Sequence, residues 1–288
     1  MDRTDLVMLG HFAKDELIVD GVGEVSSGGG VYYGSIALRS LGLAVAVVTK
    51  LHADDFWRLQ ELREAGVQVY ASPAAQTSGI ANYYDSRDME RRICKPLGFA
   101  GKFSLDEIPD IPARIYAITP IIAGEVDLEL IKALARRAPL ALDVQGFVRV
   151  RKDGKLIFQE WPEMVEGLSL ITYLKVDRAE AELLTGITSM EAAAEKLAGY
   201  GPKEVIVTQS SGITAYAEGM IYEAPFNPRS LEGRTGRGDT CFSAYLGVRL
   251  NSSPDKACRI AAEVTSLKQE KPGPWRGSPQ DLQERLST

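Results

Sequence analysis

The sequence predicts one α/β domain built on a mostly parallel sheet. Short apolar runs that suit buried strands alternate with stretches of helical periodicity, beginning with residues 6–9, 31–41 and 44–49. This β–α–β rhythm indicates parallel strands joined by right-handed crossovers. The length of 288 residues suits one large domain, covering 1–288, with an ample buried core.

The same rhythm continues along the chain. Asp54-Asp55 is expected to open a helix that runs to Ala65, because acidic residues favour a helix start and Gly66 a helix end. Further strands are expected at 67–70, 114–119, 140–143, 170–174, 204–208, 213–217 and 220–223, and further helices at 127–138, 191–199, 255–270 and 278–286. Lys152-Asp153-Gly154 is a hairpin turn signal.

Two alternating segments differ from this pattern. Residues 78–84 and 91–96 are separated by a polar stretch, as in an exposed hairpin. With residues 16–26 they could form a small sheet over a site, and a plain surface hairpin is the alternative.

Composition excludes several classes of function. The net charge is −6 without a long basic run, which argues against nucleic acid as the main partner. No segment reaches the roughly 18 apolar residues that a membrane helix needs, and the N-terminus lacks a signal peptide pattern. The three cysteines lack metal-type spacing and nothing requires a disulfide, so a reducing cytoplasm is expected. The two histidines leave little material for a multi-histidine metal site or a serine–histidine relay.

The segment from Gly233 to Tyr245 is the strongest chemical signal. Gly236 and Gly238 form a turn that leads into a helical pattern, where backbone N–H groups can bind an anion. Asp239 follows at once and could take a proton from an alcohol, so the segment suits phosphoryl transfer to a hydroxyl. The alternative is an ordinary glycine turn with an aspartate cap.

This segment resembles the C-terminal signature of the ribokinase-like (PfkB) carbohydrate kinases, Asp-Thr-x-Gly-Ala-Gly-Asp. Three more segments resemble family motifs in the family's order: Gly10 with Asp15, Gly28 to Gly42, and Lys175 to Gly186. The resemblance spans Gly10 to about Pro274. It implies a three-layer α/β/α sandwich with a small β lid from about 12–26 and 78–97, through which a homodimer could form.

The resemblance also implies an ATP-dependent kinase for a small sugar or cyclitol. Asp239 would be the base, and the Gly236–Gly238 turn with Arg237 would stabilise the phosphoryl group. Substrate-binding residues would be Asp15, Gly29, Gly30, Tyr33, Asp143, Gln145 and Arg149. Nucleotide-binding residues would be Thr208, Ser210, Gly212, Thr235, Gly236 and Gly238. Asp177 and Glu180 would hold Mg²⁺, and the alternative for this pair is a capping box at a helix start.

The sequence departs from the family pattern at several positions. Gly233 and Arg237 replace the usual Asp and Ala, Tyr33 and Asp177 replace Asn, and Ser210 replaces Gly. Tyr33 and the Asp143-Val144-Gln145 segment look more like the inositol kinase branch, which favours a myo-inositol-like acceptor. A nucleoside kinase and a non-catalytic nucleotide- or sugar-binding relative are the alternatives. Because Asp239 sits at a helix N-terminus, its pKa is expected to be depressed.

Overall fold

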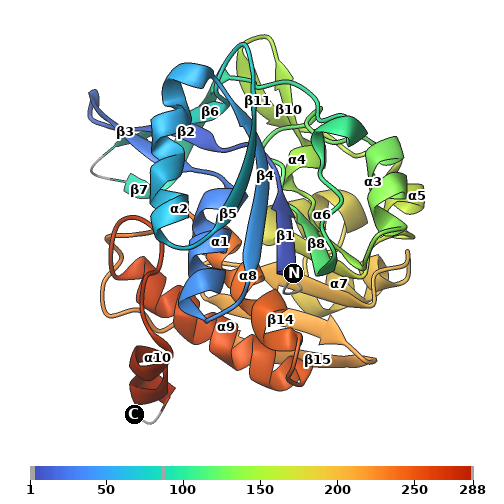
Figure 1. Ribbon diagram of the computed structural model, residues 1–288. Helices are drawn as coiled ribbons and strands as arrows, with labels where there is room; N and C mark the ends of the chain where they lie inside the picture. Colours follow the sequence, from blue (N-terminus) through green and yellow to red (C-terminus); the bar gives the residue numbers. More distant parts are fainter. Residues whose placement is uncertain (1–3, 86–87, 287–288) are drawn as a thin grey trace.

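The computed structural model describes residues 4–85 and 88–286 and is centred on a nine-stranded sheet (Figure 1). The strand order is β15-β14-β13-β12-β9-β8-β1-β4-β5. The bounds are β1 (Thr4–Leu9), β4 (Val45–Leu51), β5 (Gln68–Pro73), β8 (Ala113–Ile118), β9 (Leu140–Asp143), β12 (Tyr173–Asp177), β13 (Glu204–Thr208), β14 (Gly212–Ala217) and β15 (Met220–Pro225). Neighbours from β5 to β13 pair in parallel, and β14 and β15 continue the sheet antiparallel.

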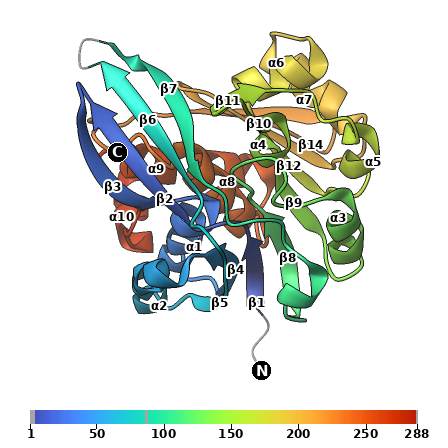
Figure 2. The same ribbon diagram turned by 90° about the horizontal axis from the view of Figure 1, so that it is seen from above.

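Helices cover both faces of this sheet, which confirms the three-layer α/β/α architecture (Figures 1 and 2). One face carries α1 (Gly30–Ser40), α2 (Gln60–Glu64), α8 (Arg237–Arg249) and α9 (Pro254–Gln269), and α10 (Pro279–Leu286) packs against α9. The other face carries α3 (Leu128–Ala135), α5 (Met164–Leu168), α6 (Arg178–Thr185) and α7 (Met190–Ala198). In the described residues, none of these helices has the length and apolar character to cross a bilayer.

The central strands are mostly apolar because both of their faces are buried. In β1, Leu6 and Met8 join the core under α1 and α8, whereas Val7 and Leu9 join the core on the opposite face. This alternation follows from the two-residue period of a strand. The continuous apolar runs of the sequence therefore correspond to the middle of the sheet.

A second, four-stranded sheet has the order β3-β2-β6-β7. Its strands are β2 (Ala13–Val19), β3 (Val22–Gly28), β6 (Gly79–Asp85) and β7 (Asp88–Gly98). The β2–β3 hairpin turns at Asp20 and Gly21, whose φ angles of 49° and 84° fit a tight hairpin turn. The small sheet stands to one side of the main sheet in Figure 2. It joins the predicted hairpin of residues 78–84 and 91–96 to residues 16–26, as the sequence suggested.

Two predicted elements differ in the structure. The strand expected at 170–174 lies at Tyr173–Asp177, because Leu170 and Ile171 close the turn after α5 by hydrogen bonds to Gly167 and Leu168. The helix expected at 54–65 is a 3₁₀ segment, η1 (Ala53–Leu59), followed by the short α2. The hairpin predicted at Asp153-Gly154 is confirmed as β10 (Arg149–Lys152) and β11 (Lys155–Phe158). The remaining short elements are η2 (Leu105–Glu107) and α4 (Gln145–Val148).

Candidate active site

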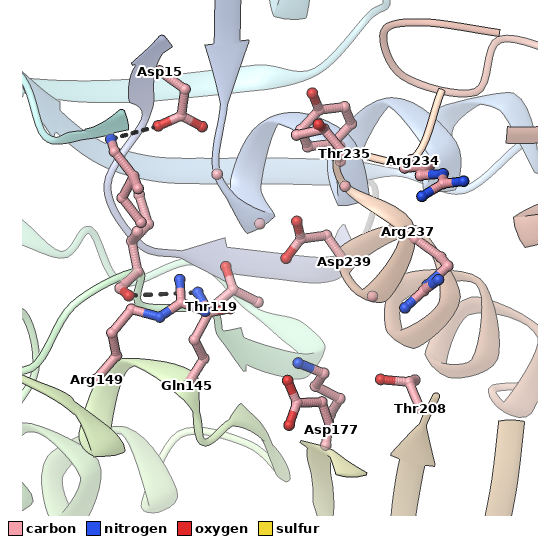
Figure 3. A pocket seen from close by; sticks show the side chains of 18 of the residues that line it. Asp15, Thr119, Gln145, Arg149, Asp177, Thr208, Arg234, Thr235, Arg237 and Asp239 are labelled. Carbon is pink, nitrogen blue, oxygen red and sulfur yellow. Dashed lines mark hydrogen bonds between the residues drawn. The ribbon is translucent and has the colours of Figure 1, made fainter. Parts of the chain in front are cut away.

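A cavity of about 360 Å³ opens where the carboxyl ends of the central strands meet the start of α8 (Figure 3). This edge is where open α/β sheets bind ligands. Of the residues predicted from the sequence, the cavity is lined by Asp15, Gly29, Gly30, Tyr33, Gln145, Arg149, Asp177, Thr208, Ser210, Thr235, Gly236, Arg237, Gly238 and Asp239. The predicted residues Asp143, Glu180 and Gly212 lie outside the lining.

The glycine turn before α8 forms an anion cradle. Gly236 is the N-cap of α8 with φ 80° and ψ 10°, a left-handed conformation that favours glycine. Thr240 N donates to Gly236 O at 2.9 Å, and this bond closes the first turn of the helix. The N–H groups of Gly238 and Asp239 precede it and have no carbonyl of the helix to bind. They and the helix dipole therefore favour an anion at this end of the cavity.

Close packing leaves no room for a side chain at Gly236 or at Gly30. A Cβ on Gly236 would lie 2.3 Å from the nearest ring carbon of Tyr33. A Cβ on Gly30 would lie 2.6 Å from Thr119 Cβ and 3.2 Å from an oxygen of Asp239. The two glycine turns therefore bring α1 and α8 together around the Asp239 carboxylate.

Asp239 lies between two groups of polar side chains (Figure 3). Asp15, Gln145 and Arg149 are on one side, and Arg234, Arg237 and Thr208 are on the other. Burial and the nearby Asp143 carboxylate raise the pKa of Asp239 to about 6, although Lys175 and Arg149 oppose this shift. The expected depression of this pKa by the helix N-terminus is wrong, because burial outweighs the dipole. A carboxylate with this pKa is ionised at neutral pH and is a better proton acceptor than an ordinary aspartate.

In the first group, Asp15 and Gln145 are held in place by hydrogen bonds to backbone atoms. Asp15 accepts a hydrogen bond from Ile80 N at 2.8 Å, so the strands β2 and β6 of the small sheet fix its position. A Cβ on Gly28 would lie 2.3 Å from an oxygen of the Asp15 carboxylate, which explains the glycine there. Gln145 Nε2 donates to Ile121 O at 3.4 Å. Two segments far apart in the sequence, β2 and residues 145–149, thus present polar groups to the same half of the cavity.

Lys175 is a cavity residue whose role the sequence did not reveal. It lies on β12 and is only 4% exposed, and its Nζ is 3.1 Å from Asp143 and 3.7 Å from Glu180. Burial alone would lower the pKa of Lys175, but Asp143, Glu180 and other carboxylates raise it, so it stays charged. A Cβ on Gly238 would be 3.6 Å from Lys175 Nζ, so this ammonium borders the anion cradle. A lysine between the apolar Leu174 and Val176 was the available signal in the sequence.

Asp143 and Glu180 support Lys175 from behind the cavity wall. Asp143 is 2% exposed and also accepts a hydrogen bond from Gln145 N at 3.0 Å. Burial raises the pKa of Glu180 to about 7, and the nearby Lys175 lowers it. The structure therefore gives Asp143 a part in holding Lys175 and Gln145 rather than a place in the lining.

Asp177 and Glu180 form a capping box at the start of α6. Asp177 accepts from Glu180 N at 2.8 Å, and Glu180 accepts from Asp177 N at 2.7 Å. Asp177 also lines the cavity, and the second oxygen of the buried Glu180 has no hydrogen-bond partner. This donor set fits a hydrated Mg²⁺ ion, which takes few protein ligands. Across the described part of the chain, no cluster of three or more His, Cys, Asp or Glu side chains forms a fuller metal site.

Four polar lining residues were not assigned a site role from the sequence: Asn82, Thr119, Lys175 and Arg234. Asn82 lies in the small sheet and accepts a hydrogen bond from Cys94 Sγ at 3.3 Å. Thr119 directly follows β8, so its place at a strand end was the signal for it. Arg234 stands in the glycine turn, but its sequence position does not indicate where its side chain points.

The fold and the cavity together define a phosphotransferase that acts on a hydroxyl group. A carboxylate lies at a glycine-built anion cradle, with cations on one side and polar acceptor residues on the other. Residues 9–281 match the model of the pfkB family carbohydrate kinases, and the chain belongs to this family.

Solved structures and a curated protein resemble the chain. A sulfate complex of a pyrophosphate-dependent kinase in the ribokinase family has a TM-score of 0.90 and 36% identity, covering 97% of this chain and 99% of that one. A pyrophosphate-dependent kinase complexed with a pyrophosphate analog and myo-inositol has a TM-score of 0.90 and 35% identity over the same shares. A cytidine kinase from Thermococcus kodakarensis is 27% identical over 94% of this chain and 98% of its own length. The chain is thus a kinase of the ribokinase family.

Proposed function

We propose that this protein transfers a phosphoryl group from pyrophosphate to a hydroxyl of a myo-inositol-like cyclitol. The observation that carries the proposal is the lining of the donor half of the cavity. Beyond Gly238 it consists of Thr208, Ser210, Arg234, Thr235 and Arg237, which are polar or cationic. A purine needs apolar or aromatic surface to stack on, whereas a small polyanion needs cations and N–H donors.

The apolar lining residues have other positions. Ile80, Pro120 and Ile121 belong to the segments that flank the acceptor half, with Asp15 and Gln145. Tyr33, the aromatic residue of the lining, packs its ring against Gly236. The pyrophosphate dependence of the two solved relatives gives independent support for this donor.

The acceptor half suits a ring with hydroxyls on all sides. Asp15 can accept hydrogen bonds from two adjacent hydroxyls, Gln145 and Asn82 can both donate and accept, and Arg149 can donate. These groups come from different segments, so they reach a bound ring from several directions. The myo-inositol found with one solved relative has this chemistry.

The proposed reaction follows from this arrangement. The acceptor oxygen forms a bond to the nearer phosphorus, the bridging P–O bond breaks, and orthophosphate leaves. Asp239 takes the hydroxyl proton, and the N–H groups of Gly238 and Asp239 stabilise the charge on the phosphoryl oxygens. Lys175, Arg234 and Arg237 hold the donor and the departing phosphate. Mg²⁺, if held by Asp177 with Glu180 behind it, would neutralise part of the donor charge.

An ATP-dependent nucleoside kinase is the second candidate, and the similarity to a cytidine kinase favours it. ATP was also the donor expected from the sequence, and it stays a prediction. This candidate requires the nucleoside part of ATP to lie outside the lined cavity, near the β13–β14 turn at Gly212. The non-catalytic alternative predicts binding without turnover.

A matrix of two donors and several acceptors separates these candidates. Purified protein with Mg²⁺ is given pyrophosphate or ATP, each with myo-inositol, ribose or cytidine, and products are followed by ³¹P NMR. We expect inositol phosphate with pyrophosphate, and no product from the Asp239→Asn variant. Turnover only with ATP and cytidine would refute the proposal, and the absence of any product would favour a binding protein.

A further inference from the structure

Lys268 is a buried cation that the proposed reaction does not use directly. It is the next-to-last residue of α9 and is 2% exposed. Its Nζ donates to Gly233 O at 2.6 Å and lies 5.3 Å from the centroid of the Tyr33 ring. Among the described residues, no carboxylate forms an ion pair with it, in contrast to Lys175. Because burying an unpaired charge is costly, a lysine here calls for a physical reason.

The end of α9 partly supplies that reason. Gly233 N donates to Gln269 O at 2.8 Å, and a Cβ on Gly233 would lie 1.8 Å from Lys271 O and 2.8 Å from Lys268 O. Gly233 is therefore seated among the carbonyls that end the helix. This end carries partial negative charge, which favours a cation. Lys268 thus ties the carbonyl of Gly233 to the helix on which the turn rests.

The same ammonium also reaches the anion cradle through Tyr33. The Tyr33 ring packs against Gly236, the N-cap of α8, and the Lys268 ammonium lies close to this ring. Lys268 therefore contacts the first residue of the Gly233–Gly236 turn and the ring that covers its last residue. Burial lowers the pKa of Lys268 to about 8, and the Asp239 carboxylate opposes this shift. A charge that responds to Asp239 will also attract an anion bound beside it.

We propose that Lys268 is a positioning residue, whose ammonium holds the Gly233–Gly236 turn and Tyr33 in the anion-binding conformation and adds fixed positive charge behind the cradle. A neutral side chain of the same length could fill this space at lower cost in free energy. The Gly233 carbonyl and the end of α9 account for part of this charge, and an anion bound at the turn accounts for the rest. The inference rests on the proposed phosphoryl transfer at this site, but it is independent of whether the donor is pyrophosphate or ATP.

The test compares Lys268→Met with Lys256→Met, which removes an exposed lysine from the same helix. Binding of inorganic pyrophosphate and of ATP is measured by isothermal titration calorimetry, and unfolding by urea denaturation. Because a charged contact is lost, we expect Lys268→Met to bind the donor about tenfold more weakly or worse, and Lys256→Met to bind it normally. The KM for the acceptor should change less than twofold. Stability should change little, because the loss of the donor to the buried Gly233 carbonyl offsets the removal of an unpaired buried charge.

A second variant separates charge from packing. Lys268→Ala leaves a space at Gly233 O that ammonium or methylammonium ions can enter, and we expect these ions to restore part of the donor affinity. Normal donor binding by Lys268→Met would overturn the inference, and so would loss of stability without loss of affinity per folded molecule. A wild-type protein that binds a donor but phosphorylates no acceptor would refute only the proposed function. A wild-type protein that binds neither donor would refute both.

Discussion

Replacing Gly236 with alanine tests the anion cradle most directly. Gly236 has φ 80°, where a residue with a Cβ costs about 1–2 kcal/mol. The added Cβ would also lie 2.3 Å from a ring carbon of Tyr33, a distance that real contacts do not reach. Moving the buried ring adds about 1–3 kcal/mol, as in other overpacked sites. We therefore expect Gly236→Ala to lower the free energy of unfolding by about 2–5 kcal/mol.

The effect on catalysis should exceed the effect on folding. Displacing Tyr33 or the turn moves the N–H groups of Gly238 and Asp239, and loss of one such donor typically lowers kcat by about 10²–10³-fold. Stability is measured by urea unfolding and kcat by product formation at saturating donor and acceptor, under conditions where the variant is fully folded.

Gly42→Ala is the matched control. Gly42 has φ 85°, but a Cβ there has no atom within 4 Å, so this variant contains the backbone strain without the clash. We expect it to lose about 1–2 kcal/mol and to keep normal kcat. If Gly236→Ala showed the same stability loss as Gly42→Ala and an unchanged kcat, the cradle described here would not be the site of phosphoryl transfer.

Four further outcomes follow from buried charges. Because Asp239 must be ionised to accept a proton and its pKa is about 6, kcat/KM should fall about tenfold per pH unit below pH 6, as a pH profile of initial rates will show. This pKa is raised above its unfolded value, so the contribution of Asp239 to stability is largest at low pH and decreases as the pH rises through 6. Asp239→Asn should therefore be inactive but more stable than the wild type in urea titrations at pH 8. Equal or lower stability would contradict this expectation. Lys175→Met leaves Asp143 and Glu180 buried without their cation and should cost about 3–5 kcal/mol in unfolding free energy, much of which the double variant with Asp143→Asn should restore. Glu125 accepts hydrogen bonds from three backbone N–H groups, so Glu125→Gln should lower the free energy of unfolding by about 1–3 kcal/mol. The variant should also raise the KM for the acceptor, because two of those N–H groups belong to the Ile121–Ile122 segment beside the cavity. An unchanged KM would show that this segment does not bind the acceptor.

The sequence predicted the parts of the site that depend on local chemistry. A glycine turn followed by Asp239 is recognisable because the turn requires a left-handed residue and the carboxylate is adjacent in the chain. The alternation of apolar runs likewise predicted the parallel sheet, because strand and helix periods are local properties. The helical layers on both faces were implied by the resemblance to the family.

The parts that depend on distant contacts were not predictable in this way. Lys175 on β12 stays charged beside the cradle because the fold brings Asp143 of β9 and Glu180 of α6 next to its ammonium. The raised pKa of Asp239 also depends on burial among residues far away in the chain. Lys268 and Gly233 are 35 positions apart, and nothing in either segment alone indicates their hydrogen bond.

The parallel pairing of β2 with β6 determines when the small sheet can form during synthesis of the chain. Glu16 pairs with Ala81, and the intervening chain contains α1, β4, α2 and β5. On the ribosome, β2 and β3 emerge early as a hairpin whose partner strand does not yet exist. The acceptor half of the cavity, which includes Asp15 and Ile80, is therefore completed only after β4 and β5 have been synthesised and β6 has paired with the β2–β3 hairpin.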